Sequence, residues 1–391
     1  MSWNSSDLVR GGLERSGWDE TSEALILTSG FVYGSAEEAE AAFAGEADRY
    51  IYSRYGNPTV GMFQERLRTI EGAEACYATA SGMAAVFTSL IALLETGDRV
   101  VASKGLFGSC FLILDELLPR WGISTTFVDG ADLDAWERAL EDGARVVFFE
   151  TPSNPMQGLV DIAAVSELAH AAGATVVVDN VFATPVLQSP LALGADVVVY
   201  STTKHVDGQG RTLGGAILGT EEYITERVQP FIRHTGPALS PFNAWVLVKS
   251  LETLDLRVRA QVASAAKLAA HLDDASGIER VWYPHLESHP QVELARAQMR
   301  AGGTVVTFSV PGGKDAAFRF LNSLEVIDIS NNLGDAKSLV THPASTTHRR
   351  LGPDVRSDMG ITDGVVRISV GLEDIDDLIN DVDRATKAAL T

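Results

Sequence analysis

The chain contains little cysteine and little positive charge. Its two cysteines, Cys76 and Cys110, form no CxxC pair, which excludes a disulfide framework and a sequence-local zinc cluster. Lys and Arg number 31 against 52 Asp and Glu, so the formal net charge of the 391 residues is −21. Because nucleic acids and anionic membranes repel such a chain, we expect neither as a partner.

Long hydrophobic runs are also scarce. Residues 75–94 are uncharged over nearly the length of a membrane span, but hydroxyl residues and Gly82 interrupt this run. Residues 1–20 contain no apolar secretory segment, so we expect a cytoplasmic protein. The composition, 46% hydrophobic and 21% charged residues, is that of a globular protein, and the length suggests two or three domains or one large domain with an appended lobe.

The pattern along the chain predicts three parts. Residues 1–60 are polar and Gly-rich, which predicts an N-terminal arm with a short helix near residues 35–44. From residue 61, short β-branched runs alternate with helical stretches, which predicts βαβ units and a mostly parallel sheet. We place a large domain at residues 61–250 and a smaller α+β domain at 251–391, linked by one long helix over residues 244–275.

The strand candidates are short apolar or β-branched runs. VVFFE and TVVVD are apolar nearly throughout, as in strands covered on both faces. The expected strands are residues 99–102, 124–128, 146–150, 175–179 and 197–200 in the large domain, and 303–310, 325–330 and 365–369 in the small one. The expected helices include residues 133–140 and 162–171 and a closing helix after Asp374.

Polar residues that directly follow strand candidates mark the expected site, because ligands of open α/β sheets bind beyond the carboxyl ends of the strands. Lys204 follows a strand and three small hydroxyl residues. Desolvation there would lower the pKa of its amine and free a nucleophile, although an ordinary surface lysine would fit the same loop. Asp179 ends an apolar strand, where its carboxylate either has a cationic or hydrogen-bonding partner or caps a helix.

Two further segments complete this pattern. Residues 80–83 open an apolar helix, whose small residues and free N–H groups suit a phosphate. Asn154, between two prolines, either hydrogen-bonds a ring hydroxyl or is a plain turn residue. With Lys204 and Asp179, these segments match the needs of pyridoxal 5'-phosphate (PLP), which are a lysine for the aldehyde, an acid for the pyridine nitrogen and a phosphate site.

Other chemistries find little support. Gly208, Gly210 and Gly214 miss the dinucleotide fingerprint by one residue and do not open a helix after a strand. No GxxxxGK[ST], HExxH or GxSxG motif occurs. His285 and His289 have the spacing of metal ligands on a helix, but the flanking prolines favour a loop, and we expect no metal.

Seven segments match motifs of one known family. They are YSRYGNPT (52–59), ATASGMAA (78–85), ETPSNP (150–155), VVVDNVFATP (176–185), STTKHVDGQGR (201–211), LGDAKSLVTHPAST (333–346) and VRISVGLEDIDDL (366–378). On these motifs the chain, from about Ser53 onward, resembles the Cys/Met-metabolism family of PLP-dependent enzymes. The resemblance implies the fold-type-I, aspartate-aminotransferase-like α/β architecture of a PLP-dependent transferase, with a PLP-binding large domain, and a homotetramer.

The resemblance also implies a role for each matching residue. Lys204 would form the Schiff base with PLP, Asp179 would pair with its pyridine nitrogen, and Arg367 would bind the substrate α-carboxylate. The other implied residues are Tyr52 and Arg54 at the phosphate of a neighbouring subunit, Ser81, Gly82, Met83, Ser201 and Thr203 at the phosphate, Phe107 stacked on the ring, Asn154 at its hydroxyl and Asn332 near the substrate. Tyr52 is in addition a candidate acid–base helper.

The implied activity is γ-replacement, in which O-succinylhomoserine and sulfide give homocysteine and succinate for methionine biosynthesis. DGQGR after Lys204 and ISNNLGDAKSLVTHPA are most similar to members with this activity. Phe107 stands where the family usually has Tyr, and the region Cys110–Leu112 lacks an arginine of cystathionine-handling relatives, which favours a small nucleophile. Cystathionine γ-synthase, methionine or cystathionine γ-lyase and a non-catalytic PLP-fold protein remain alternatives, as does an acetyl in place of a succinyl ester.

Overall fold

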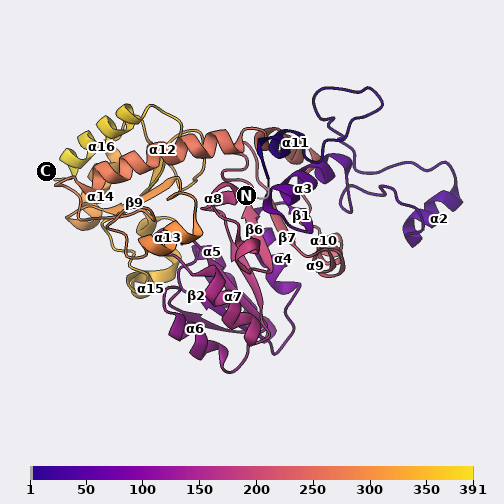
Figure 1. Cartoon of the computed structure of the whole chain (residues 1–391), viewed down its shortest axis with the longest axis horizontal. Helices are drawn as coiled ribbons and strands as arrows, with labels where there is room; N and C mark the ends of the chain where they lie inside the picture. The colour runs from indigo at the N-terminus through magenta and orange to yellow at the C-terminus, as the bar shows by residue number, and fades with distance from the viewer. Residues whose placement is uncertain (1–2, 391) are drawn as a thin grey trace.

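Two β-sheets organise the chain in the computed structural model, which describes residues 3–390. The larger sheet has seven strands in the order β1-β7-β6-β5-β4-β2-β3, and the smaller has five in the order β10-β11-β12-β9-β8. Helix α12 (Leu254–Asp273) runs from the side of the large sheet to the small sheet along the top of the molecule in Figure 1.

The large sheet is mostly parallel, as predicted. Its strands are β1 (Ala75–Thr79), β2 (Arg99–Ser103), β3 (Ser124–Val128), β4 (Val146–Glu150), β5 (Thr175–Asp179), β6 (Val197–Ser201) and β7 (Gly215–Gly219). The strands β2 to β6 pair in parallel, and only β7 pairs antiparallel, with β1 and β6. The five predicted strands are present with ends within one residue. β7 was not predicted, because the run GAILG is bounded by glycines and has one β-branched residue.

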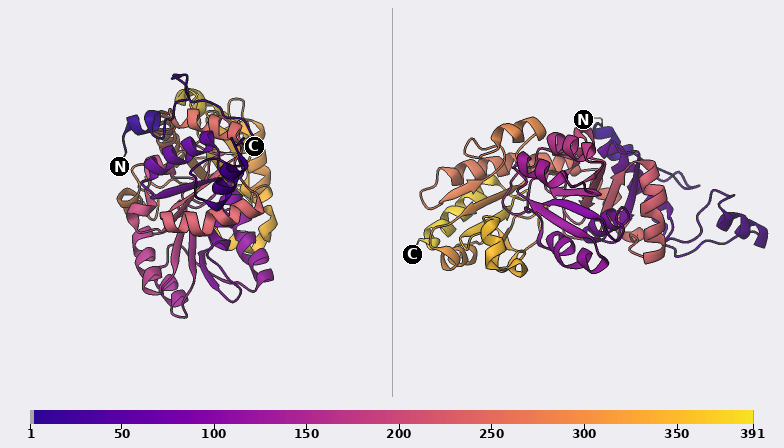
Figure 2. Two further views of the ribbon diagram at one scale, coloured as in Figure 1. Left: turned by 90° about the vertical axis from the view of Figure 1, so that its right-hand side faces the viewer. Right: turned by 90° about the horizontal axis from the view of Figure 1, so that it is seen from below.

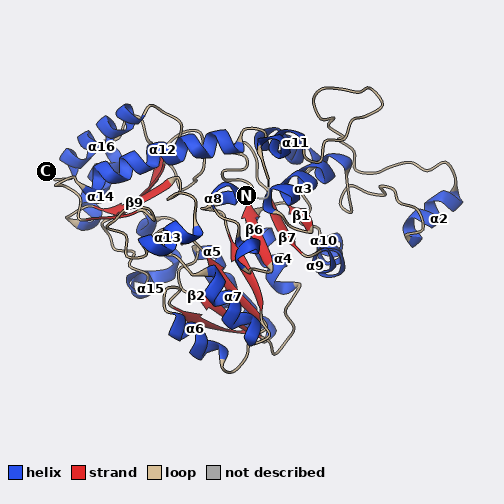
Figure 3. Cartoon of the chain, in the orientation of Figure 1, coloured by secondary structure: helices blue, strands red, loops and turns tan. Residues whose placement is uncertain are grey.

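Helices cover both faces of this sheet (Figure 3). Phe148 of β4 packs with Val86 of α4 (Gly82–Ile91), whereas the next residue, Phe149, packs on the other face with Val165 of α7 (Ile162–Ala171). Burial on both faces explains the apolar runs of β4 and β5. The other helices of this part are α3 (Pro58–Glu71), α5 (Gly108–Leu112), α6 (Leu133–Leu140), α8 (Thr184–Leu187), α9 (Glu221–Tyr223), α10 (Gln229–Thr235) and α11 (Pro241–Leu251).

The small sheet forms a separate α+β layer with its own core. Its strands are β8 (Arg280–Trp282), β9 (Val305–Ser309), β10 (Asp328–Ile329), β11 (Leu339–Thr341) and β12 (Val365–Ser369). Helices α12, α14 (Gly313–Asn322) and α16 (Ile375–Ala389) supply the apolar residues that cover it, and α13 (Val292–Gln298) and α15 (Gly352–Asp358) lie nearby. β8 and β11 were not predicted, because three residues are too few to show a period.

The single long helix predicted over residues 244–275 was wrong. The segment forms two helices, α11 and α12, separated at Glu252 and Thr253. The Thr253 hydroxyl donates to the backbone oxygen of Ser250 and accepts from Nε of Arg257. Such local side-chain bonds compete with the helical ladder and favour a break.

The N-terminal segment begins against the body of the protein, where Trp3 and Leu8 are buried in the core, and its later part around residues 36–44 extends away from the body (Figures 1 and 2). It contains α1 (Ser5–Arg10) and α2 (Ala36–Ala44), and α2 begins after Ser35, whose hydroxyl accepts from the backbone N–H of Glu38 as the predicted short helix requires. Val32 and Phe43 on this segment are 90% and 68% exposed. Within residues 3–390, no helix combines the length and the apolar character needed to cross a membrane.

Candidate active site

A cavity of about 260 Å³ lies between the carboxyl ends of β4, β5 and β6, the N-terminus of α4 and strand β12 of the small sheet. Ligands of open α/β sheets bind at this edge. The residues predicted from the sequence that line the cavity are Ser81, Gly82, Met83, Phe107, Asn154, Asp179, Ser201, Thr203, Lys204 and Arg367. The fold thus gathers into one cavity residues that are nearly 300 positions apart in the chain.

Lys204 lies in the turn after β6, with its amine at the cavity. Its backbone oxygen accepts from the N–H of Gly208 at 2.8 Å, and its Nζ donates to Oδ1 of Asn332. Burial, helped by the positive charge of Arg367, lowers the pKa of Lys204 from 10.5 to about 8. At pH 7 about a tenth of the amine is therefore neutral and nucleophilic, far more than for a lysine of ordinary pKa.

Two buried carboxyl groups lie side by side at the cavity. Asp179 at the end of β5 pairs in register with Glu150 at the end of β4. Oδ1 of Asp179 accepts from the N–H of Val181 at 3.0 Å, and no ion pair to Asp179 is found among residues 3–390. Burial raises the pKa of Asp179 to about 7, and burial together with the charge of Asp179 raises the pKa of Glu150. A buried carboxylate without a cation favours a ligand that brings a positive charge.

The opposite end of the cavity is suited to an anion. Ser81 caps α4 by accepting from the N–H of Ala84 at 3.1 Å, so the first N–H groups of the helix remain free. A Cβ at position 82 would lie 2.5 Å from Cβ of Ser201, so only glycine allows the helix to approach β6 this closely. The hydroxyls of Ser201 and Thr203 line the same end, and Thr203 accepts from the N–H of Gly214 at 3.1 Å.

Arg367 of β12 brings a guanidinium group to the cavity and is 1% exposed. Nη1 donates to Oδ1 of Asn154 at 2.9 Å, and Nη2 donates to the backbone oxygens of Asn331 and Asn332 at 3.1 and 3.2 Å. Its Nε has no partner in the described structure. Burial lowers the pKa of Arg367 to about 10, partly offset by the charge of Glu150, so the group stays cationic. A fixed guanidinium with a free donor is suited to a carboxylate.

Not every predicted residue meets the cavity of its own chain. Tyr52 and Arg54 lie outside its lining, and Tyr52 is 41% exposed. Cζ of Arg54 lies 5.4 Å from the ring centroid of Tyr52 and 4.9 Å from that of Tyr55, and Nη1 donates to the backbone oxygen of Arg233. Asn332 reaches the site through its bond with Lys204 rather than as part of the lining.

Other residues of the lining were not predicted as site residues. They are Val86, Cys110, Glu150, Val181, Phe182, Leu213, Asn331, Leu333 and Thr347. Glu150 could have been found, because it ends an apolar strand as Asp179 does. Its Oε2 accepts from the N–H of Phe107 at 2.8 Å and so fixes the segment that carries the Phe107 ring. Leu333 opens the matched motif 333–346 but has no polar group to mark it as a site residue, and Thr347 comes from a loop that no local pattern connects to the site.

The residues of the cavity fit PLP. The unpaired carboxylate of Asp179 suits a protonated pyridine nitrogen, the amine of Lys204 suits an aldehyde, and the N-terminus of α4 suits a phosphate. The unpartnered Nε of Arg367 leaves a donor for an amino-acid carboxylate. Among the described residues, no three His, Cys, Asp or Glu side chains are grouped as metal ligands would be.

Known proteins are similar to this chain over nearly its whole length. The sequence profile of the Cys/Met metabolism PLP-dependent enzymes matches residues 5–387. The chain is 66% identical to an O-succinylhomoserine sulfhydrylase of Mycobacterium tuberculosis, over 96% of this chain and 94% of that protein. It is 50% identical to an O-succinylhomoserine sulfhydrylase of Pseudomonas aeruginosa, over 97% of this chain and 94% of that protein.

A solved structure is similar over the same extent. It is that of an O-acetylhomoserine (thiol)-lyase candidate from Campylobacter jejuni, with a TM-score of 0.93 and 30% sequence identity, over 98% of this chain and 99% of that one. That structure contains a lysine joined to the cofactor as N'-pyridoxyl-lysine-5'-monophosphate.

Proposed function

The chain belongs to the family of Cys/Met metabolism PLP-dependent enzymes, and on that premise we propose that it converts O-succinylhomoserine and sulfide to homocysteine and succinate. The reaction is a γ-replacement within methionine biosynthesis. The observation that carries the proposal is the cavity in which Lys204, Asp179 and Arg367 meet. The names of the relatives at 66% and 50% identity support the choice of substrates.

The proposed cofactor contacts follow from the fit of the cavity. Lys204 would hold the aldehyde and Asp179 the pyridine nitrogen, while Phe107 would stack on the ring. Asn154 would lie near the ring hydroxyl, and the phosphate would be held by Ser81, Gly82, Met83, Ser201 and Thr203. When bound, PLP supplies an electron sink for negative charge that develops on the substrate carbon.

Arg367 is the proposed anchor for the substrate. Its Nη groups already bond to Asn154 and to the backbone at residues 331 and 332, so its orientation is fixed before substrate arrives. Binding the α-carboxylate there would hold the Cα–H bond in one direction. Such positioning accounts for a large part of catalytic rate, because the reacting groups no longer search for each other.

Lys204 is the proposed proton carrier. The lowered pKa of about 8 means that its amine could carry protons away from Cα and Cβ before the γ-group leaves, and return them to Cβ and Cα after sulfide has added at Cγ. Asn332, which accepts from Nζ, would hold the amine at the cavity. The γ-succinyl group would leave as succinate, a carboxylate that needs no strong acid to assist its departure.

The lining of the cavity favours a small nucleophile. Among the described lining residues, only Lys204 and Arg367 carry a positive charge. Both already have roles, so the carboxylate of a second amino acid would lack a cationic partner. Cys110 and Phe107 offer no replacement, which supports sulfide over cysteine.

We also propose that the active sites are shared between subunits of a cytoplasmic homotetramer. The exposed arm and the position of Tyr52 and Arg54 outside their own cavity support a role at the phosphate of a neighbouring subunit. Tyr52 would then also be placed to help in acid–base steps. In this arrangement residues 1–60 are the arm, residues 61–250 the PLP-binding domain and residues 251–391 the small domain.

The choice of reaction is tested by product analysis. The PLP-loaded enzyme is given O-succinylhomoserine with equal concentrations of sulfide and cysteine, with each alone, or with neither, and O-acetylhomoserine is run in parallel. We expect homocysteine and succinate as main products. Cystathionine as the main product would reassign the chain as a cystathionine γ-synthase, and rapid release of 2-oxobutanoate without a thiol would make it a γ-lyase. No turnover of any ester would leave the non-catalytic alternative.

Shared active sites predict complementation between inactive variants. Arg54→Ala and Lys204→Ala are each expected to be inactive as pure proteins. After the two are unfolded and refolded together, random pairing makes half of the dimers mixed, and one of the two sites in each mixed dimer is intact. We therefore expect about a quarter of wild-type activity. Activity that stays at the level of the separate variants would mean that Arg54 and Lys204 of the same chain act in one site, so that the sites are not shared between subunits.

A further inference from the structure

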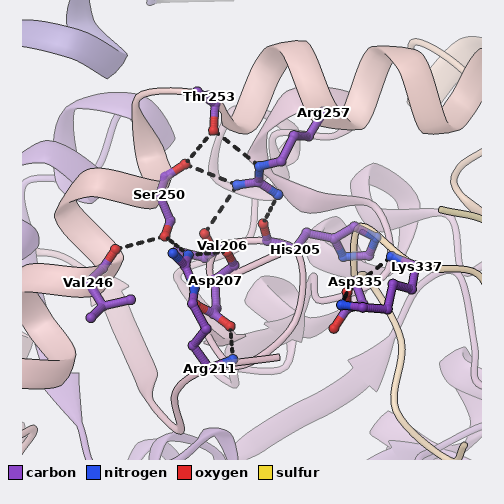
Figure 4. A network of polar contacts seen from close by, with 10 residues as sticks. All are labelled: His205, Val206, Asp207, Arg211, Val246, Ser250, Thr253, Arg257, Asp335 and Lys337. Atoms are coloured by element: carbon purple, nitrogen blue, oxygen red, sulfur yellow. Dashed lines mark hydrogen bonds and ion pairs between the residues drawn. The ribbon is translucent and has the colours of Figure 1, made fainter. Parts of the chain in front are cut away.

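A buried arginine on α12, Arg257, contacts the backbone of His205 and Val206, the two residues that follow Lys204 in the chain (Figure 4). Nη1 of Arg257 donates to the backbone oxygen of His205 at 2.8 Å. Nη2 donates to the backbone oxygens of Val206 at 3.3 Å and Ser250 at 3.0 Å, and Nε donates to the hydroxyl of Thr253 at 3.2 Å. One guanidinium therefore ties together the two peptides that follow Lys204 and the end of α11.

The partners of Arg257 are neutral oxygens, since its guanidinium forms no ion pair within residues 3–390. Keeping a buried charge in such surroundings is costly unless its donors are bonded, and here each of its three nitrogens donates at least one hydrogen bond. Gly208 makes room for the group. A Cβ at position 208 would lie 1.8 Å from Nη1 of Arg257, and the φ of +66° also favours glycine.

A second residue on the same face of α12 holds the segment across from Lys204. Gln261 follows Arg257 by one helical turn, and its Nε2 donates to the backbone oxygens of Asp335 at 2.7 Å and Val370 at 3.1 Å. The N–H of Ala336 donates to the backbone oxygen of Gly208 at 2.8 Å, which joins the two held segments. The segment that carries Asp335 and Ala336 follows directly after Asn332, the hydrogen-bond partner of Lys204.

We propose that Arg257 and Gln261 are positioning residues that together set how the Lys204 amine lies relative to Asn332 and Arg367. Arg257 fixes the Lys204 turn, and Gln261 fixes the segment that Arg367 holds through the backbone oxygens of Asn331 and Asn332. Through these two residues, α12 would fix the positions of the segments on both sides of the cavity without contacting substrate or cofactor. The inference deepens the proposed function and rests on it.

The test compares Arg257→Met with Arg259→Met in the PLP-loaded enzyme. Arg259 lies on the same helix, two residues on, but its side chain is 59% exposed and bonds to Asp255. Methionine keeps the length and helix propensity of arginine but leaves the oxygens of His205, Val206 and Ser250 without their donor. We expect kcat of Arg257→Met to fall about 100-fold while KM changes less than about threefold, because misplacing a catalytic group costs rate rather than binding. Arg257→Lys, with fewer and less rigid donors, is expected to fall between the two.

The visible absorbance of the bound cofactor gives a readout that needs no substrate. We expect the pH at which this absorbance changes to shift in Arg257→Met and to stay at the wild-type value in Arg259→Met. Wild-type kcat and wild-type absorbance in a folded Arg257→Met protein, whatever its melting temperature, would reduce the residue to a structural role and overturn the proposal.

Gln261→Leu keeps the proposal testable where Arg257→Met does not fold. Because Gln261 acts on the segment held by Arg367, we expect this variant to raise KM about tenfold or more, with a smaller loss of kcat. An unchanged KM in folded Gln261→Leu would contradict the proposal. Failure of the proposed function would look different, because the wild-type enzyme itself would then not turn over O-succinylhomoserine with sulfide. The comparison of cofactor absorbance between Arg257→Met and Arg259→Met would still test the positioning proposal.

Discussion

Replacing Lys204 with alanine is expected to abolish the conversion of O-succinylhomoserine and sulfide, with a loss of at least about 10⁴-fold in kcat. The substitution removes the amine of Lys204, which would both hold the cofactor and carry protons during the reaction. Its pKa is lowered to about 8, and it donates to Asn332. Initial rates of succinate release measure the loss. The purified variant is also expected to lose the visible absorbance of a covalently held cofactor.

The matched control for this variant is Lys267→Ala, because Lys267 is an exposed lysine of α12. It is expected to keep wild-type turnover and colour. Removing the buried amine of Lys204 takes away a desolvated charge, so Lys204→Ala should fold at least as well as the wild type, and circular dichroism checks this. Normal turnover by folded Lys204→Ala would end the proposed mechanism.

Replacing Arg367 with alanine is expected to raise KM for O-succinylhomoserine by between about 30-fold and several thousand-fold, since truncating one partner of a buried charge pair costs about 2–5 kcal/mol. The carboxylate would be held by Arg367 both before and during the reaction, so most of the loss should fall on KM, with a smaller loss of kcat because the Cα–H bond is no longer held in one direction. Steady-state kinetics over a wide range of substrate concentrations measure the two separately.

Two comparisons separate loss of the anchor from general damage at Arg367. Arg367→Lys keeps the charge but lacks the planar fork, and we expect an intermediate KM. A decarboxylated analogue of the substrate should bind to the wild type and to Arg367→Ala with similar affinity, because it has no carboxylate to lose. A KM unchanged from wild type in Arg367→Ala would remove this residue from the site.

Much of the large sheet could be predicted because its strands are buried on both faces and so leave apolar runs in the sequence. β7 was missed because its burial depends on pairing with β1 and β6 rather than on its own composition. The break at Thr253 depends on a bond to Arg257, which no helical periodicity reveals. In each case the element depends on a specific contact, either between strands distant in the chain or between side chains one helical turn apart, and the composition of the segment does not reveal that contact.

The site shows the same division. Lys204, Asp179 and the α4 N-terminus could be placed together from the rule that ligands bind at the carboxyl ends of strands, and Glu150 follows the same rule. Arg367 comes from the other sheet, and only resemblance to the family suggested its role. Arg257 and Gln261 carry no sequence signal at all, since a helix that bears arginine and glutamine usually exposes them to solvent.

The outstretched arm has a consequence for a newly synthesised subunit. Its apolar side chains Val32 and Phe43 are largely uncovered by their own chain, at 90% and 68% exposure. In the proposed assembly a second copy would cover them, and until it binds they can contact other unfolded chains, so assembly would compete with aggregation. The yield of native enzyme would then depend on whether copies associate before they aggregate.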